Sequence, residues 1–175
     1  MMSNSWRRWL GRQPVASDQI NRATPGPPLP YSWILTNQLA IGPMPVSPLH
    51  WQQLDQAGLR GRFSCCYPQE DRSPPLPQGW LNAQVSLPDH RQQERLQQER
   101  LVQALSTAEQ MLDTGAPLYV HCLAGIERSP LVAIGLTARR RGINLYEALD
   151  WVRRCHPAAL PIYDHLELLE QVLKG

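Results

Sequence analysis

Residues 118–136 of this chain read LYVHCLAGIERSPLVAIGL, and they determine how its core is organised. The apolar run at 118–121 predicts a buried strand. Residues 130–141 start with side chains that are apolar nearly all round, which predicts a buried helix with Ser129 as N-cap and Pro130 at its first position. A short loop therefore joins the carboxyl end of a strand to a helix, which is where ligands bind in open α/β sheets.

The rest of the chain alternates between strand and helix patterns. Apart from the pair above, strands are predicted at 33–36, 39–41, 63–67 and 83–87, and helices at 48–57, 91–112, 145–155 and 162–173. This alternation predicts an α/β fold with a central, largely parallel sheet of four to five strands flanked by helices. One domain is expected at 31–175.

Residues 1–30 predict a proline-rich, flexible N-terminal tail, because the stretch TPGPPLP at 24–30 cannot hold a helix. A cluster of tryptophan and arginine, Trp6 to Trp9, could contact a partner or an acidic surface. A solvated tail, or one that packs on its own domain, explains the cluster equally simply.

The composition of the chain excludes several functional classes. A net charge of +2 is too small to indicate a nucleic-acid or membrane partner, and no apolar run is long enough to span a membrane. Four cysteines in 175 residues form neither a disulfide framework nor zinc-site spacing, and the five histidines make no metal constellation. We therefore expect a cytoplasmic, monomeric protein without cofactor, metal or nucleic-acid partner.

The loop that follows the buried strand suits an anion. Its backbone N–H groups and the helix N-terminus create positive potential, which also favours the thiolate form of Cys122. Arg128 can fold back to bind phosphate oxygens in a bidentate manner, and Gly125 allows the tightest curl of the backbone. Ser129 can hydrogen-bond the sulfur, and His121 can support the loop from behind.

These residues resemble a known family. His-Cys-x-x-Gly-x-x-Arg-Ser is the signature of the protein tyrosine phosphatase superfamily, and the sequence from His121 to Ser129 matches every fixed position. The resemblance implies that Cys122 is the nucleophile and that the loop binds the phosphate, through Leu123, Ala124, Gly125, Ile126, Glu127 and Arg128. The alternative is a structural cysteine in an ordinary loop.

A phosphatase of this type also needs a general acid, which the superfamily carries on a movable loop before the cysteine. Asp89 in the sequence LPDH fits that role, and its alternative role is to cap the next helix. Asp71 in a polar turn is the second candidate, and simple solvation explains it as well. The chain is short and has no recognisable phosphotyrosine-recognition loop. In both respects it resembles the compact dual-specificity phosphatases of the superfamily.

Two further residues depart from the common pattern or add to it. Glu127 stands where many dual-specificity enzymes have glycine, and its carboxylate would oppose an anion unless it points outward or pairs with a cation; we expect it to face solvent. Cys66 resembles a strand-end cysteine that forms a reversible disulfide with the nucleophile in some relatives, although two small core residues at 65 and 66 are the simpler interpretation.

The sequence therefore predicts a metal-independent phosphatase that acts on phosphorylated protein through a cysteinyl-phosphate. The rival interpretations are a low-turnover phosphate-recognition module, a phosphatase for phosphoinositides or RNA 5′-phosphates, and a redox or sulfur-transfer enzyme. A loop without lysine favours a phosphoprotein over a phosphoinositide.

Overall fold

A computed structural model of the chain describes residues 26–175. Most of the predicted N-terminal tail, including the Trp6 to Trp9 cluster, lies outside the described residues. The last part of that tail packs on the domain. Leu29 is buried, and its backbone N–H and C=O pair with the side-chain amide of Gln53 at 2.8 and 3.0 Å.

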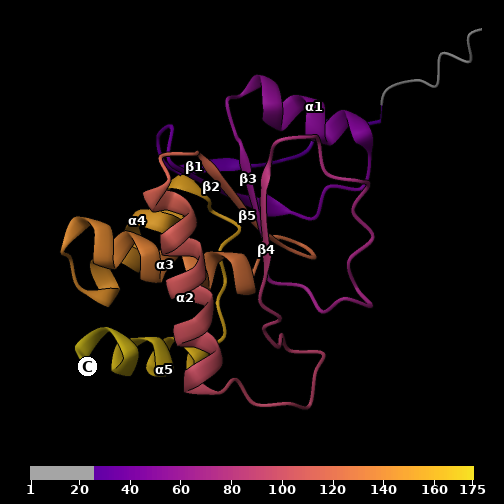
Figure 1. Cartoon of the computed structure of the whole chain (residues 1–175). Coiled ribbons are helices and arrows are strands. Elements are labelled where there is room, and N and C mark those ends of the chain that lie inside the picture. The colour runs from indigo at the N-terminus through magenta and orange to yellow at the C-terminus, as the bar shows by residue number, and fades with distance from the viewer. Residues whose placement is uncertain (1–25) are drawn as a thin grey trace, which may run out of the picture.

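The centre of the fold is a five-stranded sheet in the order β1-β2-β5-β3-β4 (Figure 1). Its strands are β1 (Ser32–Leu35), β2 (Leu39–Pro43), β3 (Gly61–Ser64), β4 (Leu81–Gln84) and β5 (Leu118–Cys122). β1 pairs antiparallel with β2, and all other pairs are parallel. The prediction of an α/β fold with a largely parallel central sheet is therefore confirmed.

Helices cover both faces of the sheet. They are α1 (Pro48–Gln56), α2 (Gln98–Asp113), α3 (Arg128–Arg141), α4 (Leu145–Cys155) and α5 (Tyr163–Lys174). Helices α2 to α5 form the larger core with one face of the sheet, whereas Trp51 and Leu54 of α1 pack with Ala40 and Tyr119 on the other face. Alternate strand residues thus point into two separate apolar layers.

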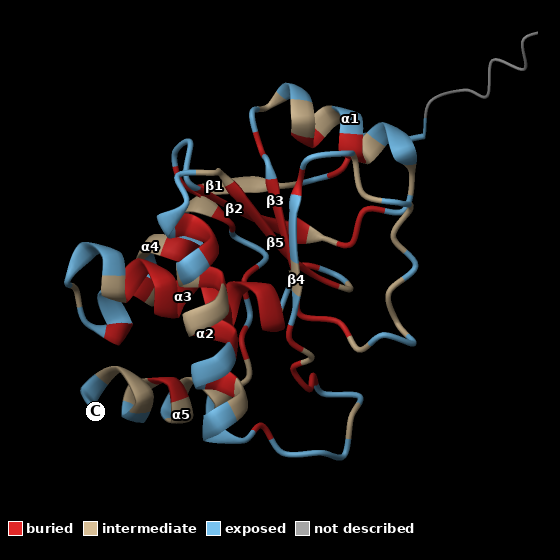
Figure 2. Cartoon of the chain, in the orientation of Figure 1, coloured by how far each residue is buried: buried red, intermediate tan, exposed pale blue. Residues whose placement is uncertain are grey.

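Strand β5 and helix α3 form the most buried part of the molecule (Figure 2). Every residue of β5 is buried, and β2 and β3 pair with it on either side. Helix α3 contacts α2, α4, α5 and the sheet, so its apolar side chains are covered all round. The loop between the two elements is consequently held from both ends by the core.

Some predicted boundaries are wrong, each for a local reason. Helix α2 begins at Gln98 rather than at residue 91, because the side chains of Arg91 and Gln92 bond to groups outside a helix. Helix α3 begins at Arg128, and Ser129 does not cap it, since the Ser129 hydroxyl donates to the Cys122 sulfur instead. No helix in the 26–175 range is long and apolar enough to span a membrane.

Candidate active site

The phosphate loop, residues 122–128, leaves the end of β5 with several of its carbonyls turned outward. The carbonyl of Leu123 accepts from the N–H of Met44 at 3.2 Å, and that of Ile126 accepts from the N–H of Leu160 at 2.8 Å. His156 contacts the carbonyl of Gly125 through Nε2 at 3.0 Å. Because these carbonyls are tied to the surrounding structure, the loop backbone is fixed from outside.

Gly125 is the one position in this loop that cannot carry a side chain. Its φ angle is +76°, and a Cβ there would lie 2.6 Å from the carbonyl carbon of Gly42 and 2.8 Å from the nitrogen of Pro43. Both atoms are backbone and cannot move aside without shifting β2. The predicted role of Gly125 at the tightest part of the curl agrees with this geometry.

The Cys122 thiol lies inside the loop and is buried. Its Sγ accepts hydrogen bonds from the Gly125 N–H at 3.3 Å and from the Ser129 hydroxyl at 3.4 Å. Burial alone raises the pKa of Cys122, but the Ser129 hydrogen bonds, the Arg128 charge and the Gly125 N–H outweigh it and lower the pKa below its usual value. The structure thus favours a thiolate at this position.

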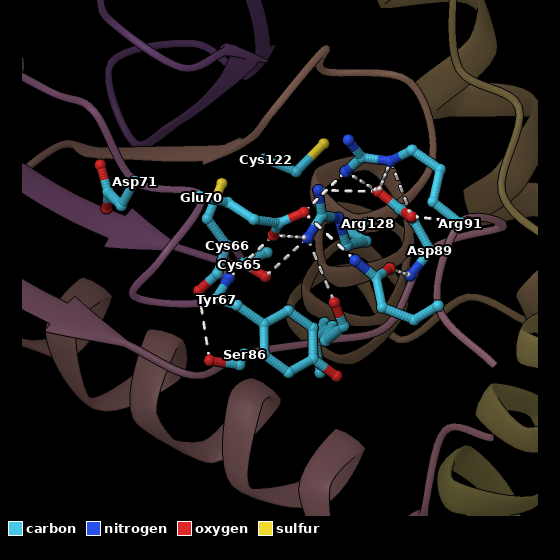
Figure 3. A network of polar contacts seen from close by, with 12 residues as sticks. Cys65, Cys66, Tyr67, Glu70, Asp71, Ser86, Asp89, Arg91, Cys122 and Arg128 are labelled. Carbon is cyan, nitrogen blue, oxygen red and sulfur yellow. Dashed lines mark hydrogen bonds and ion pairs between the residues drawn. The ribbon is translucent and has the colours of Figure 1, made fainter. Parts of the chain in front are cut away.

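Arg128 is 1% exposed and lies at the centre of the polar network (Figure 3). Its Nη1 donates to Glu70 at 2.8 Å and to the carbonyls of Leu87 and Cys65 at 3.3 and 3.5 Å. Its Nη2 lies 2.9 Å from a carboxylate oxygen of Asp89. The Nε has no hydrogen-bond partner among the described residues.

Asp89 lies in a loop of residues 85–97 between β4 and α2, here called the Asp89 loop. Its carboxylate pairs with Arg91 at 2.6 Å as well as with Arg128. Burial raises the pKa of Asp89, but the Arg91 hydrogen bonds and the Arg128 charge prevail and lower it. Asp89 is therefore ionised in this arrangement, whereas a general acid must carry a proton. The helix-capping alternative is excluded, because α2 begins only at Gln98.

These residues line one cavity of about 210 Å³. Its lining includes Cys122, Asp89, Arg91 and the apolar side chains of Leu123 and Ile126. The predicted nucleophile Cys122, Arg128 and the candidate acid Asp89 therefore face a common space, although they come from β5, α3 and the Asp89 loop.

Glu70 and Arg91 belong to the site, although the sequence did not single them out. Glu70 pairs with Arg128 at 2.8 Å and with Arg91 at 2.7 Å, and it also accepts from the N–H of Tyr67 at 2.9 Å. Burial raises the pKa of Glu70, and the Arg128 and Tyr67 hydrogen bonds and the nearby arginines lower it further than burial raises it. In the sequence, only its place next to the candidate acid Asp71 pointed to Glu70.

Asp71 does not reach the cavity. It pairs with Arg62, accepts from Ser64 at 3.2 Å and lies apart from Asp89 and Arg128 in Figure 3. The expectation that Asp71 is solvated is wrong, because Arg62 is itself buried and needs an anion. Arg62 also donates to His121 Nε2 at 3.0 Å, and burial next to Arg62 lowers the pKa of His121 to about 3. A neutral His121 thus lies behind the loop.

Glu127 does not face solvent as expected. One carboxylate oxygen lies 2.6 Å from His90 Nδ1, and the other accepts from the His90 backbone N–H at 3.2 Å. The side chain of Glu127 is 19% exposed, whereas that of His90 is 68% exposed. The carboxylate is turned to the Asp89 loop because that loop presents two donors at one residue.

Cys65 and Cys66 are both buried and free. Burial raises the pKa of Cys66 to about 11, with the Arg128 charge opposing this rise, so Cys66 is a neutral thiol. A Cys66–Cys122 disulfide under oxidation stays a prediction, which mass spectrometry of peroxide-treated protein can test.

His156 is a further residue that the sequence did not reveal. It follows α4, is buried, and contacts the Ser32 hydroxyl through Nδ1 at 2.9 Å in addition to the Gly125 carbonyl. A carbonyl can only accept, so Nε2 carries the proton and Nδ1 accepts from Ser32. His156 therefore connects the phosphate loop to β1.

One group of three residues in the described part of the chain could hold a metal ion. Ligand atoms of Asp89, His90 and Glu127 lie within 4.8 Å of one another. The Asp89 oxygens already pair with two arginines, and Glu127 already pairs with His90. These contacts explain the group, and we assign no ion to it.

Comparisons with known proteins agree with this geometry. No family model matches the chain. It is 30% identical over 86 residues to the protein-tyrosine-phosphatase IBR5 of Arabidopsis thaliana, and the match covers 46% of this chain and only 34% of that protein. The chain thus spans about a third of the length of this curated relative.

Solved structures match over more of the chain. The crystal structure of human DUSP28 has a TM-score of 0.67 at 25% identity and covers 87% of this chain and 97% of its own. A mouse putative dual specificity phosphatase, complexed with zinc tungstate, has a TM-score of 0.70 at 23% identity, covering 86% and 91%. PTPMT1 in complex with PI(5)P has a TM-score of 0.70 at 18% identity, covering 82% and 94%.

The sheet order, the loop between β5 and α3 and these neighbours lead to one conclusion about the fold. The chain has the compact dual-specificity phosphatase fold of the protein tyrosine phosphatase superfamily.

Proposed function

We propose that this protein is a phosphatase that hydrolyses phosphate monoesters through a cysteinyl-phosphate on Cys122. One observation carries the proposal: the Cys122 sulfur accepts two hydrogen bonds inside a cavity that Arg128 also lines. A buried structural cysteine has no need of a lowered pKa, whereas a nucleophile does.

The two edges of the Arg128 guanidinium suit different partners. Glu70 and two carbonyls occupy Nη1, which fixes the plane of the group. The Nε has no partner among residues 26–175, and Nη2 is shared only with Asp89. A phosphate dianion can bind the Nε and Nη2 edge in a bidentate manner.

Phosphate binding would also prepare Asp89 as the acid. The dianion competes with Asp89 for Nη2 of Arg128, which removes one cation from the carboxylate and brings negative charge close to it. Both effects favour the protonated form of a carboxyl group. Asp89 is thus expected to gain a proton in the substrate complex, although its pKa is low without substrate.

The proposed reaction has two steps, formation of the cysteinyl-phosphate and its hydrolysis. The Cys122 thiolate attacks phosphorus and forms the S–P bond while the ester P–O bond breaks, and Asp89 gives its proton to the leaving oxygen. Water then attacks the cysteinyl-phosphate and passes a proton to Asp89, which releases inorganic phosphate and the thiolate. Arg128 and the loop N–H groups stabilise the charge on the phosphoryl oxygens in both steps.

We infer that a phosphorylated protein side chain is the substrate. The cavity has apolar walls at Leu123, Ala124 and Ile126 and no lysine, and the Glu127 carboxylate, which also lines it, opposes a second phosphate nearby. A phosphoinositide is the alternative, since PTPMT1 shares the fold and was solved with PI(5)P. A panel of phosphopeptides, inositol lipids and RNA 5′-phosphates separates these substrates.

The mechanism is tested with Cys122→Ser and an aryl phosphate. We expect hydrolysis to fall by at least about 10⁴-fold, because the nucleophile is lost, while inorganic phosphate still binds. Cys155→Ser is the matched control, since Cys155 is a free cysteine at the end of α4, and it should keep wild-type activity. Strong residual activity in Cys122→Ser would overturn the mechanism.

A low-turnover phosphate-recognition module is the second candidate, and one observation favours it. Asp89 pairs with two arginines and is ionised, so it has no proton to donate. A module that only binds phosphate does not need a proton donor. Wild-type protein that binds phosphate but hydrolyses no aryl phosphate would establish this alternative.

A further inference from the structure

Glu127 makes a two-point contact between the phosphate loop and the Asp89 loop. It immediately precedes Arg128 and occupies the N-cap position of α3 without capping the helix with its side chain. Its two oxygens instead bond to the ring and the backbone N–H of His90 at 2.6 and 3.2 Å. Glu127 is the only hydrogen-bond partner of His90 in the described chain.

The backbone contact acts directly on Asp89. The His90 N–H belongs to the peptide that follows Asp89, so a hydrogen bond to it restricts the rotation that aims the Asp89 side chain. His90 is 68% exposed, so little packing holds its side chain in place of this bond. The Asp89–His90 peptide is thus held at two points, by Glu127 at its N–H and by the Gln92 N–H, which donates to the Asp89 carbonyl at 3.1 Å.

One of the other ties of Asp89 is lost when substrate binds. Asp89 is held by Arg128, Arg91 and Gln92, and the proposed phosphate position uses the Arg128 edge that Asp89 now contacts. The Glu127–His90 contact involves neither arginine, so it persists when phosphate takes that edge. Glu127 matters most in the state in which Asp89 acts as an acid.

We propose that Glu127 and His90 form a positioning pair that holds Asp89 at the cavity while it protonates the leaving oxygen. The inference rests on the proposed phosphatase function and adds a residue in the phosphate loop that serves the acid. It also explains how a carboxylate is tolerated beside a phosphate site, because its charge is directed to the donors of His90.

The test compares two substrates that need the acid to different degrees. Phenyl phosphate has a poor leaving group and requires protonation, whereas 4-nitrophenyl phosphate has a good one and requires little. We expect Glu127→Ala to lower kcat/KM for phenyl phosphate about tenfold and to change it less than about threefold for 4-nitrophenyl phosphate. His90→Ala keeps the backbone N–H that bonds to Glu127, so it should lower the phenyl phosphate value selectively but by less. His90→Ala is the safer variant for folding, since that side chain is exposed.

Two further variants separate positioning from a structural effect. Glu127→Gln keeps one acceptor oxygen and offers an N–H to His90, whose ring nitrogen can accept, so it should restore most of the phenyl phosphate activity. In an Asp89→Asn background, Glu127→Ala should have no additional effect, because no acid remains to be positioned. Glu109→Ala, which removes a carboxylate on α2 that pairs with Arg139 of α3, is the control with wild-type kinetics.

The contrary outcomes are distinct. Equal losses for both substrates would show that Glu127 supports the phosphate loop and not the acid, and a gain for both would show that it only repels phosphate. Either result overturns the positioning role while the phosphatase function stands. Wild-type protein that hydrolyses neither substrate would overturn both, and it is recognised before any variant is made.

Discussion

The phosphate loop and the Asp89 loop face the same cavity but are held by different forces. Backbone hydrogen bonds fix the phosphate loop from outside, through Met44, Leu160 and the side chain of His156, between two buried elements. The Asp89 loop lies outside any helix or strand, and side-chain ion pairs hold its tip. Backbone contacts within the core persist, whereas the buried Asp89–Arg128 pair opens only when another anion, such as a phosphate, takes the place of Asp89 on Arg128.

This difference matches the two tasks that we propose for these loops, to carry the nucleophile and to carry the general acid. The nucleophile and the N–H groups around it must be in place before substrate arrives, because their geometry sets the stabilisation of charge. Asp89 is ionised without substrate and has to carry a proton when substrate is bound. Its protonation state therefore has to depend on the charges around it. Arg128 belongs to both regions, since it lies in the loop and pairs with Asp89.

Apart from the loss of the nucleophile itself, the largest effect is expected where the two regions meet. Arg128→Lys keeps one charge but offers no fork, so it cannot serve Glu70, Asp89 and a phosphate together. We expect kcat/KM for any aryl phosphate to fall by about 10³-fold. Arg139→Lys is the matched control, because Arg139 lies on the same helix and pairs with Glu109. A loss below tenfold would show that a point charge is sufficient.

A smaller effect is expected for the residue that fixes the arginine. Glu70→Ala removes the partner of Arg128 Nη1 and one partner of Arg91. We expect kcat/KM to fall about 10-fold to 100-fold, and equally for phenyl and 4-nitrophenyl phosphate, because the misplaced group is Arg128 and not the acid. Asp89→Asn should instead affect phenyl phosphate selectively.

Glu94→Ala is the control for Glu70→Ala, since Glu94 lies nearby on the Asp89 loop and pairs with Arg100 outside the cavity. If Glu70→Ala lost activity selectively for phenyl phosphate, Glu70 would belong with the acid, and the division between the two regions would be wrong.

The two regions also differed in how far the sequence could predict them. The phosphate loop is contiguous, so the spacing of Cys122, Gly125 and Arg128 carried its geometry, and the strand before it and the helix after it were recognisable from their apolar runs. The Asp89 network joins residues 70, 89, 91 and 127, and no local pattern brings them together. Glu70 and Arg91 could only be found in three dimensions.

Local patterns failed where side chains had a second use. Residues 91–97 have helical composition, but Arg91 and Gln92 bond to Glu70, and the chain stays irregular until Gln98. Serine is a favoured N-cap residue, yet the Ser129 hydroxyl donates to the Cys122 sulfur. Helix propensity does not decide the structure at these positions, because a hydrogen bond to a charged or buried partner stabilises the fold more than a helix cap does.

The thiolate itself gives a prediction with a definite sign. The Ser129 hydroxyl stabilises the charged sulfur, so Ser129→Ala should raise the pKa of Cys122 and move the midpoint of its alkylation by iodoacetamide to higher pH. At pH 6 the variant should react about tenfold more slowly than the wild type. Ser106→Ala on α2 is the control. An unchanged midpoint would mean that the backbone and Arg128 alone hold the thiolate.

The smallest expected effect concerns the group of Asp89, His90 and Glu127, where a metal would compete with the contacts of the Asp89 loop. Its oxygens and nitrogen are already used by Arg91, Arg128 and each other, so the acid is held by protein charges alone. EDTA should therefore leave kcat/KM unchanged for both aryl phosphates, and added Zn²⁺ should only inhibit, because it would take Asp89 from the cavity. A loss on chelation that added metal reverses would show that an ion holds the Asp89 loop, and the contrast between backbone and ion-pair support would fail.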